Sequence, residues 1–250
     1  MHEGKQKFGG EPFLAGETLK EGEFGIRELE NNPDKIVRTE SMIGSIKETA
    51  AHYKNIKANF ESMKNDYGVN VPDMDVVIGN NENGGESVFM IVDKIEGKDL
   101  GELKNLPDSV KDKFEKFYSG VLQSMFDGYK KTKPFFVDIK KENIMYGHKS
   151  KEKGAEDDFF LADVGGGFQY DNYVEYHGQI IETDYDESFF RAIVNAKTDI
   201  QDYEKKFGEN VVLDGIRSKL EKISKYCQTN QQQKLEAFFA KDPTAKEFFK

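Results

Sequence analysis

The apolar residues of this chain follow two different spacings, and these divide it into a strand-rich first part and a helix-rich second part. Between residues 13 and 38, short apolar runs are separated by glycines and by the turn-forming residues 31–34, which predicts antiparallel strands. Residues 41–66 carry apolar side chains three and four positions apart, and Gly68 follows them, which predicts one long helix. Two further strands, joined by a hairpin loop, are predicted between residues 76 and 92.

The second part of the chain is dominated by helical spacing. The clearest helix begins near Asp108, because apolar residues then recur with the helical period. These residues are Val110, Phe114, Phe117, Val121, Leu122, Met125 and Tyr129. Two short strands are predicted on either side of a charged loop at 148–158, and further helices at 190–206, 214–226 and 233–240. We therefore expect an α+β protein, with a sheet and one helix first and mainly helices afterwards.

Charge and composition exclude several classes of function. The chain has 250 residues and a net charge of −10, which repels phosphate backbones, so we expect no nucleic-acid partner. No apolar run reaches the roughly 18 to 20 residues of a membrane-spanning helix, and residues 1–10 lack an apolar signal core, so we expect a cytoplasmic protein without a membrane partner. The four histidines are scattered, which argues against structural zinc. The single Cys227 lies among apolar residues at helical spacing, which predicts a buried thiol.

The polar residues of the segment FVDIKKENIM (136–145) carry the strongest chemical signal. The spacing of Asp138, Lys140 and Asn143 resembles the catalytic loop of the protein kinases, H-R-D-L-K-x-x-N. Phosphoryl transfer, the reaction of that family, needs an acceptor for a hydroxyl proton, a cation near the transferred group and an oxygen ligand for magnesium. The three side chains can supply these groups in that order. The resemblance implies that Asp138 and Lys140 are catalytic and that Asn143 binds Mg2+.

A second segment of this kind follows about twenty residues later, where an apolar run ends in Asp163, Val164 and Gly165. It resembles the D-F-G motif of the kinases, with Val164 in place of phenylalanine. The resemblance implies that Asp163 is a second ligand of Mg2+. The interval between Asp138 and Asp163 is longer than usual in that family, but the excess lies in a hydrophilic loop where an insertion costs little.

The first part of the chain is similar to the nucleotide-covering half of a kinase. Residues 89–100 resemble the strand and hinge that lead into the second lobe, which implies that backbone groups between Asp93 and Ile95 bind the edge of adenine. The long predicted helix resembles the one that supplies an ion-pair glutamate, which implies Glu61 in this role, with Glu48 as the alternative.

Two departures from the family pattern concern the phosphate-binding groups. The segment with Gly22 and Gly25 resembles the glycine-rich loop that covers the phosphates, but Lys20 replaces the first glycine. Arg38 stands where the family has a phosphate-binding lysine. Arginine can neutralise phosphate and pair with Glu61, although its planar fork is longer and bulkier than an ammonium group.

The resemblance implies a two-lobed protein kinase-like fold. Residues 1–96 would form an N-lobe with an antiparallel sheet and one helix, and residues 97–250 a mainly helical C-lobe. It also implies ATP and Mg2+ as ligands and transfer of the γ-phosphate to a hydroxyl of a protein or a small molecule. Lys140 is typical of Ser/Thr protein kinases, whereas the motif-poor segment after Gly165 is more similar to aminoglycoside or choline kinases, so the acceptor class stays open.

Two alternatives to an active kinase remain. A pseudokinase would keep the fold as a nucleotide-binding or scaffolding module and would have lost turnover through Arg38 and the degenerate glycine-rich loop. An unrelated α/β binding protein would carry these motifs by chance.

Each candidate residue also has a structural interpretation. A polar residue at a strand end often caps a turn, and a charge on a helix or loop is usually solvated. The first interpretation applies to Asp138, Asn143 and Asp163, and the second to Lys140 and Glu61. The acidic residues Asp184, Asp186 and Glu187 are interpreted as a solvated helix start rather than a site for a basic substrate.

Overall fold

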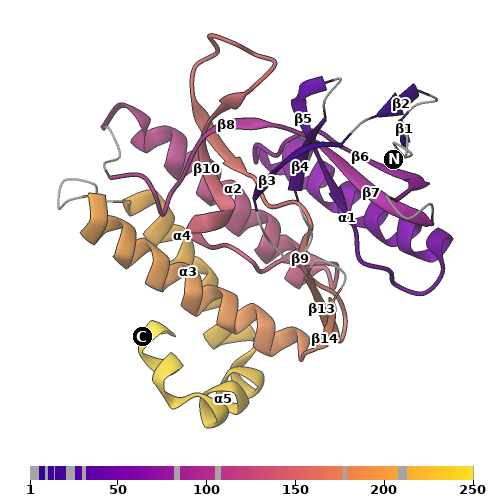
Figure 1. Ribbon diagram of the computed structural model, residues 1–250. Helices are drawn as coiled ribbons and strands as arrows, with labels where there is room; N and C mark the ends of the chain where they lie inside the picture. Colours follow the sequence, from indigo (N-terminus) through magenta and orange to yellow (C-terminus); the bar gives the residue numbers. More distant parts are fainter. Residues whose placement is uncertain are drawn as a thin grey trace.

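The structure is a computed structural model of the chain. It describes residues 6–8, 11–13, 15–20, 26–29, 32–81, 85–104, 108–176, 179–207 and 213–249. Helices and antiparallel strands are both present, so the expected mixed α and β architecture is confirmed. The strand-rich first part and the helices near the C-terminus lie on opposite sides of the molecule (Figure 1).

A five-stranded antiparallel sheet dominates the first part of the chain. Its strands lie in the spatial order β3 (Ala15–Lys20), β4 (Ile26–Leu29), β5 (Asn32–Thr39), β7 (Glu86–Asp93) and β6 (Met74–Asn80). Helix α1 (Ile46–Tyr67) connects β5 to β6 and packs against β6 and β7 (Figure 1). All but the first residue of β7 is buried, because this central strand is flanked by β5 and β6 and covered by α1.

Local interactions fix both ends of α1. Ser45 and Glu48 form a capping box at its start, and Gly68 takes the left-handed conformation (φ 67°) that ends it. Its buried face includes Tyr53 and Phe60, as the apolar spacing predicts. The helix begins later than residue 41, because Ser45 caps it and the preceding residues form a loop.

Three smaller antiparallel sheets complete the β structure. The first contains β8 (Ile95–Asp99), β10 (Ile144–Lys149) and β11 (Asp158–Leu161). The second has the order β14 (Gln179–Glu182), β13 (Tyr173–Tyr176), β12 (Gly166–Gln169) and β9 (Phe135–Phe136). The third pairs β1 (Gln6–Phe8) with β2 (Glu11–Phe13). The strands β10 and β11 around the charged loop were predicted, whereas the sheet that contains β12 to β14 was not.

Helix α2 (Lys111–Lys130) lies at the centre of the second part and contacts α1, β9, β11 and α4 (Asp214–Asn230). The other helices are α3 (Tyr185–Phe207) and α5 (Gln232–Lys241), and short 3₁₀ segments cover Asp108–Val110, Lys141–Asn143 and Pro243–Phe249. The helices predicted by apolar spacing are therefore confirmed. Within the described ranges, no helix combines the length and the apolar character that a bilayer crossing requires.

One continuous cluster of buried apolar side chains joins the strand-rich and helix-rich parts. It includes Phe60 of α1, Phe114 of α2 and Cys227 of α4. The prediction of a buried thiol is confirmed, and burial raises the pKa of Cys227 to about 12. Because this core continues across residue 96, it does not mark a boundary there, and the division into 1–96 and 97–250 stays a prediction.

Candidate functional site

Asp138 lies two residues after the end of β9, and the burial of that strand fixes its position. Phe135 and Phe136 are almost fully buried, and β9 pairs with β12. The backbone N–H of Val137 donates to the carbonyl oxygen of Gly167 at 2.8 Å. The chain therefore reaches Asp138 from a packed and hydrogen-bonded segment.

Asn143 and Lys140 both contact the carboxylate of Asp138. The amide nitrogen of Asn143 donates to Asp138 Oδ2 at 2.8 Å, and Nζ of Lys140 donates to the same oxygen at 3.1 Å. Asn143 is buried, Lys140 is half exposed, and the side chain of Asp138 keeps 17% of its exposure. The structure thus brings together three residues that the sequence placed in one motif, and it leaves the carboxylate partly open to solvent.

Two residues beside Asp138 were not singled out by the sequence. Gly167 has a φ of 82°, and a Cβ atom added to it would lie 2.8 Å from Cβ of Asp138. Burial, followed by the charge of Asp138, raises the pKa of the Tyr176 phenol on β13 to about 12. The third glycine of residues 165–167 therefore allows the chain to pass close to Asp138, a need that the sequence alone does not reveal.

Asp163 is tied to the same region through the backbone. The N–H of Ala162 donates to the carbonyl oxygen of Asn143 at 2.8 Å, so Asp163 directly follows a residue that is bonded to the 3₁₀ turn Lys141–Asn143. One carboxylate oxygen of Asp163 accepts from the N–H of Gly165 at 3.2 Å and lies 3.5 Å from Nη1 of Arg38. These contacts link the two motifs to strand β5.

Arg38 lies buried against the backbone of Gly165. A Cβ atom added to that glycine would lie 2.0 Å from Nη2 of Arg38. Nε of Arg38 donates to Oε1 of Glu40 at 2.7 Å. Burial opposes its charge, but the carboxylates of Glu40 and Asp163 hold the pKa of Arg38 above its ordinary value. Glu40, which the sequence analysis did not single out, is thus a second acidic partner of Arg38.

The expected ion pair between Arg38 and a glutamate of α1 does not form. Glu61 lies on the outer face of α1 with its side chain 53% exposed, and its carboxylate is 3.5 Å from Nζ of Lys57. Glu61 follows the buried Phe60 by one residue, a rotation of about 100° around the helix axis. The alternative, Glu48, belongs to the capping box at the exposed start of the helix. In this structure neither glutamate is the partner of Arg38.

The segment expected to contact adenine joins β7 to β8. Asp93 is buried, and its carboxylate pairs with Lys35 at 3.0 Å and Lys151 at 2.5 Å. Ile95 begins β8 and pairs with Lys149 of β10. The side chain of Asp93 therefore holds this junction of strands together.

Two backbone donors of this junction, the N–H groups of Asp93 and Lys94, are bound within the protein. The N–H of Asp93 donates to the carbonyl oxygen of Asp73 at 2.9 Å, and the N–H of Lys94 donates to that of Asp34 at 2.8 Å. The two glycines expected to cover the phosphates, Gly22 and Gly25, lie outside the described residues.

Asn143 and Asp163 provide oxygen donors of the kind that magnesium prefers. In nucleotide sites Mg2+ is commonly held by one or two protein oxygens together with phosphate oxygens. The amide nitrogen of Asn143 is turned toward Asp138, which directs its oxygen away from that carboxylate. Across the described ranges, no group of three or more His, Cys, Asp or Glu side chains is placed to hold a metal. The pair supplies at most two oxygen ligands, so a cation held here would need further ligands such as phosphate oxygens.

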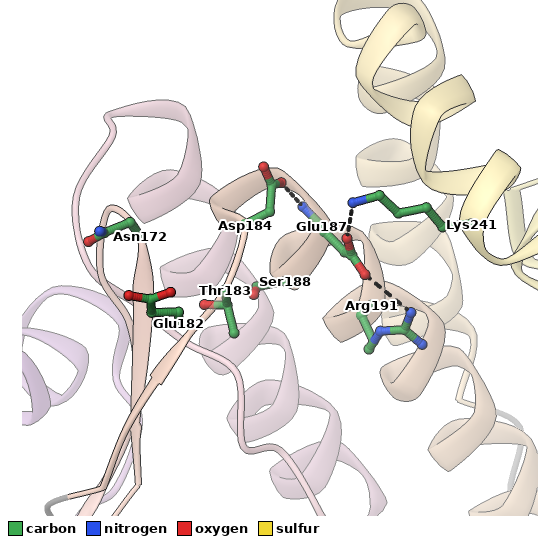
Figure 2. A pocket seen from close by; sticks show the side chains of 8 residues that line it. All are labelled: Asn172, Glu182, Thr183, Asp184, Glu187, Ser188, Arg191 and Lys241. Carbon is green, nitrogen blue, oxygen red and sulfur yellow. Dashed lines mark hydrogen bonds and ion pairs between the residues drawn. The ribbon is translucent and has the colours of Figure 1, made fainter.

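A cavity of about 660 Å³ lies at the start of α3, between that helix, the end of β14 and α5 (Figure 2). Three of its charged side chains pair with one another, because Glu187 contacts Lys241 at 2.8 Å and Arg191 at 3.6 Å. Asp184 accepts from the N–H of Glu187 at 2.8 Å, which confirms that the acidic run starts a helix. None of the lining residues belongs to the predicted site.

A partly buried carboxyl of α3 lies near the turn that carries Asn143. Burial raises the pKa of Asp199 to about 7, the carboxylates of Asp202 and Glu142 add to this effect, and Lys141 opposes it. Between the unfolded pKa of about 3.9 and this value, the folded protein holds a proton that the unfolded chain has released. The free energy of unfolding is therefore expected to fall as the pH rises through this window.

Asp199→Asn is expected to remove this part of the pH dependence, because an amide has no proton to lose. Urea unfolding at pH 5 and pH 8 should show a smaller loss of stability in the variant than in the native protein, and a more stable variant at pH 8. The exposed Asp112 on α2 offers the matched control, Asp112→Asn, which should keep the native pH profile. Parallel profiles for all three proteins would contradict the raised pKa.

Comparisons with known proteins add little to this geometry. No protein-family model matches the chain, and no curated protein matches it. Among solved structures, the chain is similar to the GDP complex of a mutant aminoglycoside 2′-phosphotransferase-IIIa, with 14% sequence identity and a TM-score of 0.39 over 92% of this chain and 86% of that one. A likeness at this level assigns the chain to no family, so the interpretation of the site depends on its own residues.

Proposed function

We propose that this protein is an ATP- and Mg2+-dependent phosphotransferase that transfers the γ-phosphate of ATP to a hydroxyl group. The observation that carries the proposal is the linked set of contacts from Asp138 through Asn143 to Asp163 and Arg38. It joins a candidate proton acceptor, two candidate metal ligands and a fixed cation, which are the groups that phosphoryl transfer requires.

Asp138, Asn143 and Lys140 each have a different role in the proposed reaction. The carboxylate of Asp138 orients the acceptor hydroxyl and takes up its proton as the oxygen attacks phosphorus. Asn143 holds this carboxylate through its amide nitrogen, so that the group needs little reorganisation during reaction. The ammonium group of Lys140, which is half exposed, neutralises charge on the transferred phosphoryl group.

In this proposal, a second group of residues holds the nucleotide and its metal ion. The oxygens of Asn143 and Asp163 bind Mg2+, which when bound neutralises the phosphate oxygens and orients them. Arg38 steadies the phosphates from its buried position beside Asp163. Residues 1–96 cover the nucleotide, with Gly22 and Gly25 over the phosphates, and residues 97–250 carry the catalytic groups.

A second candidate function is a pseudokinase that binds or scaffolds without turnover. The hydrogen bonds of the junction between Asp93 and Ile95 favour it, because the N–H groups of Asp93 and Lys94 already bind carbonyl oxygens of the protein. Adenine recognition by this segment would have to use other backbone groups or displace these bonds. Displacing them has a free-energy cost that lowers the affinity for the nucleotide.

The test is the turnover of ATP by the full chain with MgCl2 and a panel of hydroxyl acceptors that includes a Ser/Thr peptide mixture, choline and an aminoglycoside. The phosphotransferase proposal predicts formation of ADP and a phosphorylated acceptor, both lost when EDTA removes the metal. Binding of ATP without any turnover across the panel would favour the pseudokinase.

A further inference from the structure

We infer that Glu40, at the end of strand β5, is the positioning residue that orients Arg38 for the nucleotide phosphates, in place of a glutamate on α1. This inference rests on the proposed phosphotransferase function. It concerns a residue outside the motifs of the sequence, and it changes which element of the protein controls the phosphate-binding cation.

The geometry of the pair is that of a fixed, buried ion pair. Oε1 of Glu40 accepts from Nε of Arg38 at 2.7 Å, and the two side chains keep only 0% and 10% of their exposure. A charge-assisted bond in such a dry environment is stronger than one in water. The two residues are separated by two positions at the end of a strand, so their side chains leave the same face.

Glu40 directs the guanidinium group by using its inner nitrogen. Because Nε is bound to Glu40, the plane of the guanidinium is set, and the terminal nitrogen Nη1 faces Asp163 at 3.5 Å. The backbone of Gly165 lies against the terminal nitrogens and prevents their movement in that direction. Arg38 is thus oriented with its fork beside the candidate metal ligand, where phosphates of a bound nucleotide would lie.

The position of Glu40 depends on the sheet and on the first turn of α1. Its backbone N–H donates to the carbonyl oxygen of Val88 in the central strand β7 at 2.9 Å. The loop that follows is joined to α1 by Thr49, whose hydroxyl accepts from the N–H of Ile43 at 2.8 Å and donates to the carbonyl oxygen of the same residue at 3.1 Å. Glu40 is therefore held on both sides along the chain.

Helix α1 contributes the phenol of Tyr53, and not the expected carboxylate of Glu61, to the surroundings of Glu40 and Arg38. Tyr53 is fully buried, and burial, followed by the charges of Glu40 and Glu175, holds the pKa of this phenol well above its ordinary value. The phenol is thus neutral and lies beside Glu40. Since Glu61 points away from this region, outward movement of α1 would not remove the acidic partner of Arg38.

The test compares Glu40→Gln with Glu61→Gln, the same substitution at the two competing positions. ATP binding to the full chain in MgCl2 is measured by isothermal titration calorimetry, at a temperature where circular dichroism shows each protein folded. Glu40→Gln is expected to weaken ATP binding by about tenfold, because the guanidinium loses its charged anchor, whereas Glu61→Gln should bind as the native protein does.

A double-mutant cycle separates positioning from general stability. If Glu40 acts through Arg38, its substitution in an Arg38→Lys background should weaken ATP binding by less than about threefold, because a lysine has no Nε to be held. An equal loss of ATP affinity on substitution of Glu40 in the native protein and in Arg38→Lys would overturn the inference. If Glu40→Gln fails to fold, Glu40→Asp keeps the charge but withdraws it by one methylene, and an unchanged ATP affinity in that variant would overturn it too.

Different measurements test the role of Glu40 and the proposed function: the first is tested by the variants, the second by the native protein. Loss of ATP affinity in Glu61→Gln with native affinity in Glu40→Gln would return the role to α1 while leaving the proposed function intact. Absence of ATP binding in the native protein would instead remove the proposed function and, with it, the role of Glu40.

Discussion

Replacing Asp138 with asparagine is expected to lower the turnover number for phosphate transfer by about 10²- to 10⁴-fold, the range for loss of a general base. The amide is nearly isosteric, and its oxygen can still accept from Asn143, so the turn that carries the site should persist. The substitution removes the ability to take up a proton and, with it, the negative charge that pairs with Lys140. Initial rates of ADP formation with the best acceptor of the panel measure the effect.

The matched control for this variant is Asp202→Asn, which makes the same change at an exposed position of α3. It should keep native turnover. For Asp138→Asn, the ATP affinity and the melting temperature should stay near the native values, because the nucleotide is held by other residues. Native turnover in Asp138→Asn would contradict the role assigned to this carboxylate.

Gly165→Ala is expected to have the second large effect. Its new methyl group would lie 2.0 Å from Nη2 of Arg38, so the guanidinium must move away from Asp163. The expected loss in the free energy of unfolding is about 2 to 4 kcal/mol, between the cost of overpacking and that of breaking a buried ion pair. Urea unfolding measures the loss, and ATP binding should weaken with it.

A glycine in ordinary surroundings provides the control. In Gly79→Ala of strand β6, the new methyl group would meet the ring of Phe89 at 3.4 Å, an ordinary contact, so a change of less than about 1 kcal/mol is expected. If Gly165→Ala lowered the free energy of unfolding by no more than Gly79→Ala does, the close packing of Arg38 on this backbone would be refuted.

Much of the fold could be predicted because long helices carry many repeats of one signal. The apolar residues of α1 and α2 recur over five or more turns, and strands β6 and β7 are apolar runs joined by a short hairpin. The strands β12 to β14 have only four residues each, and β12 begins with two glycines. Such segments have too few alternating positions to signal a sheet, and β12 pairs with β9, a strand that is distant from it in sequence.

The site was predictable where the interacting residues are close in sequence. Asp138 and Asn143 are joined by a single turn, so their contact follows from spacing. The partner of Arg38 was not predictable in the same way, because an acidic residue two positions along a strand is common and gives no specific signal. The outward orientation of Glu61 could have been inferred from Phe60, since neighbouring residues of a helix face different directions.

The most direct test of this account is thermal unfolding of the native protein with ATP, in the presence and absence of MgCl2, alongside Asp163→Asn. A ligand at 100 times its dissociation constant adds about 2.7 kcal/mol to the free energy of unfolding. The account predicts a rise in melting temperature that needs both ATP and magnesium and that disappears in Asp163→Asn. An unchanged melting temperature of the folded native protein at millimolar ATP and magnesium would contradict it.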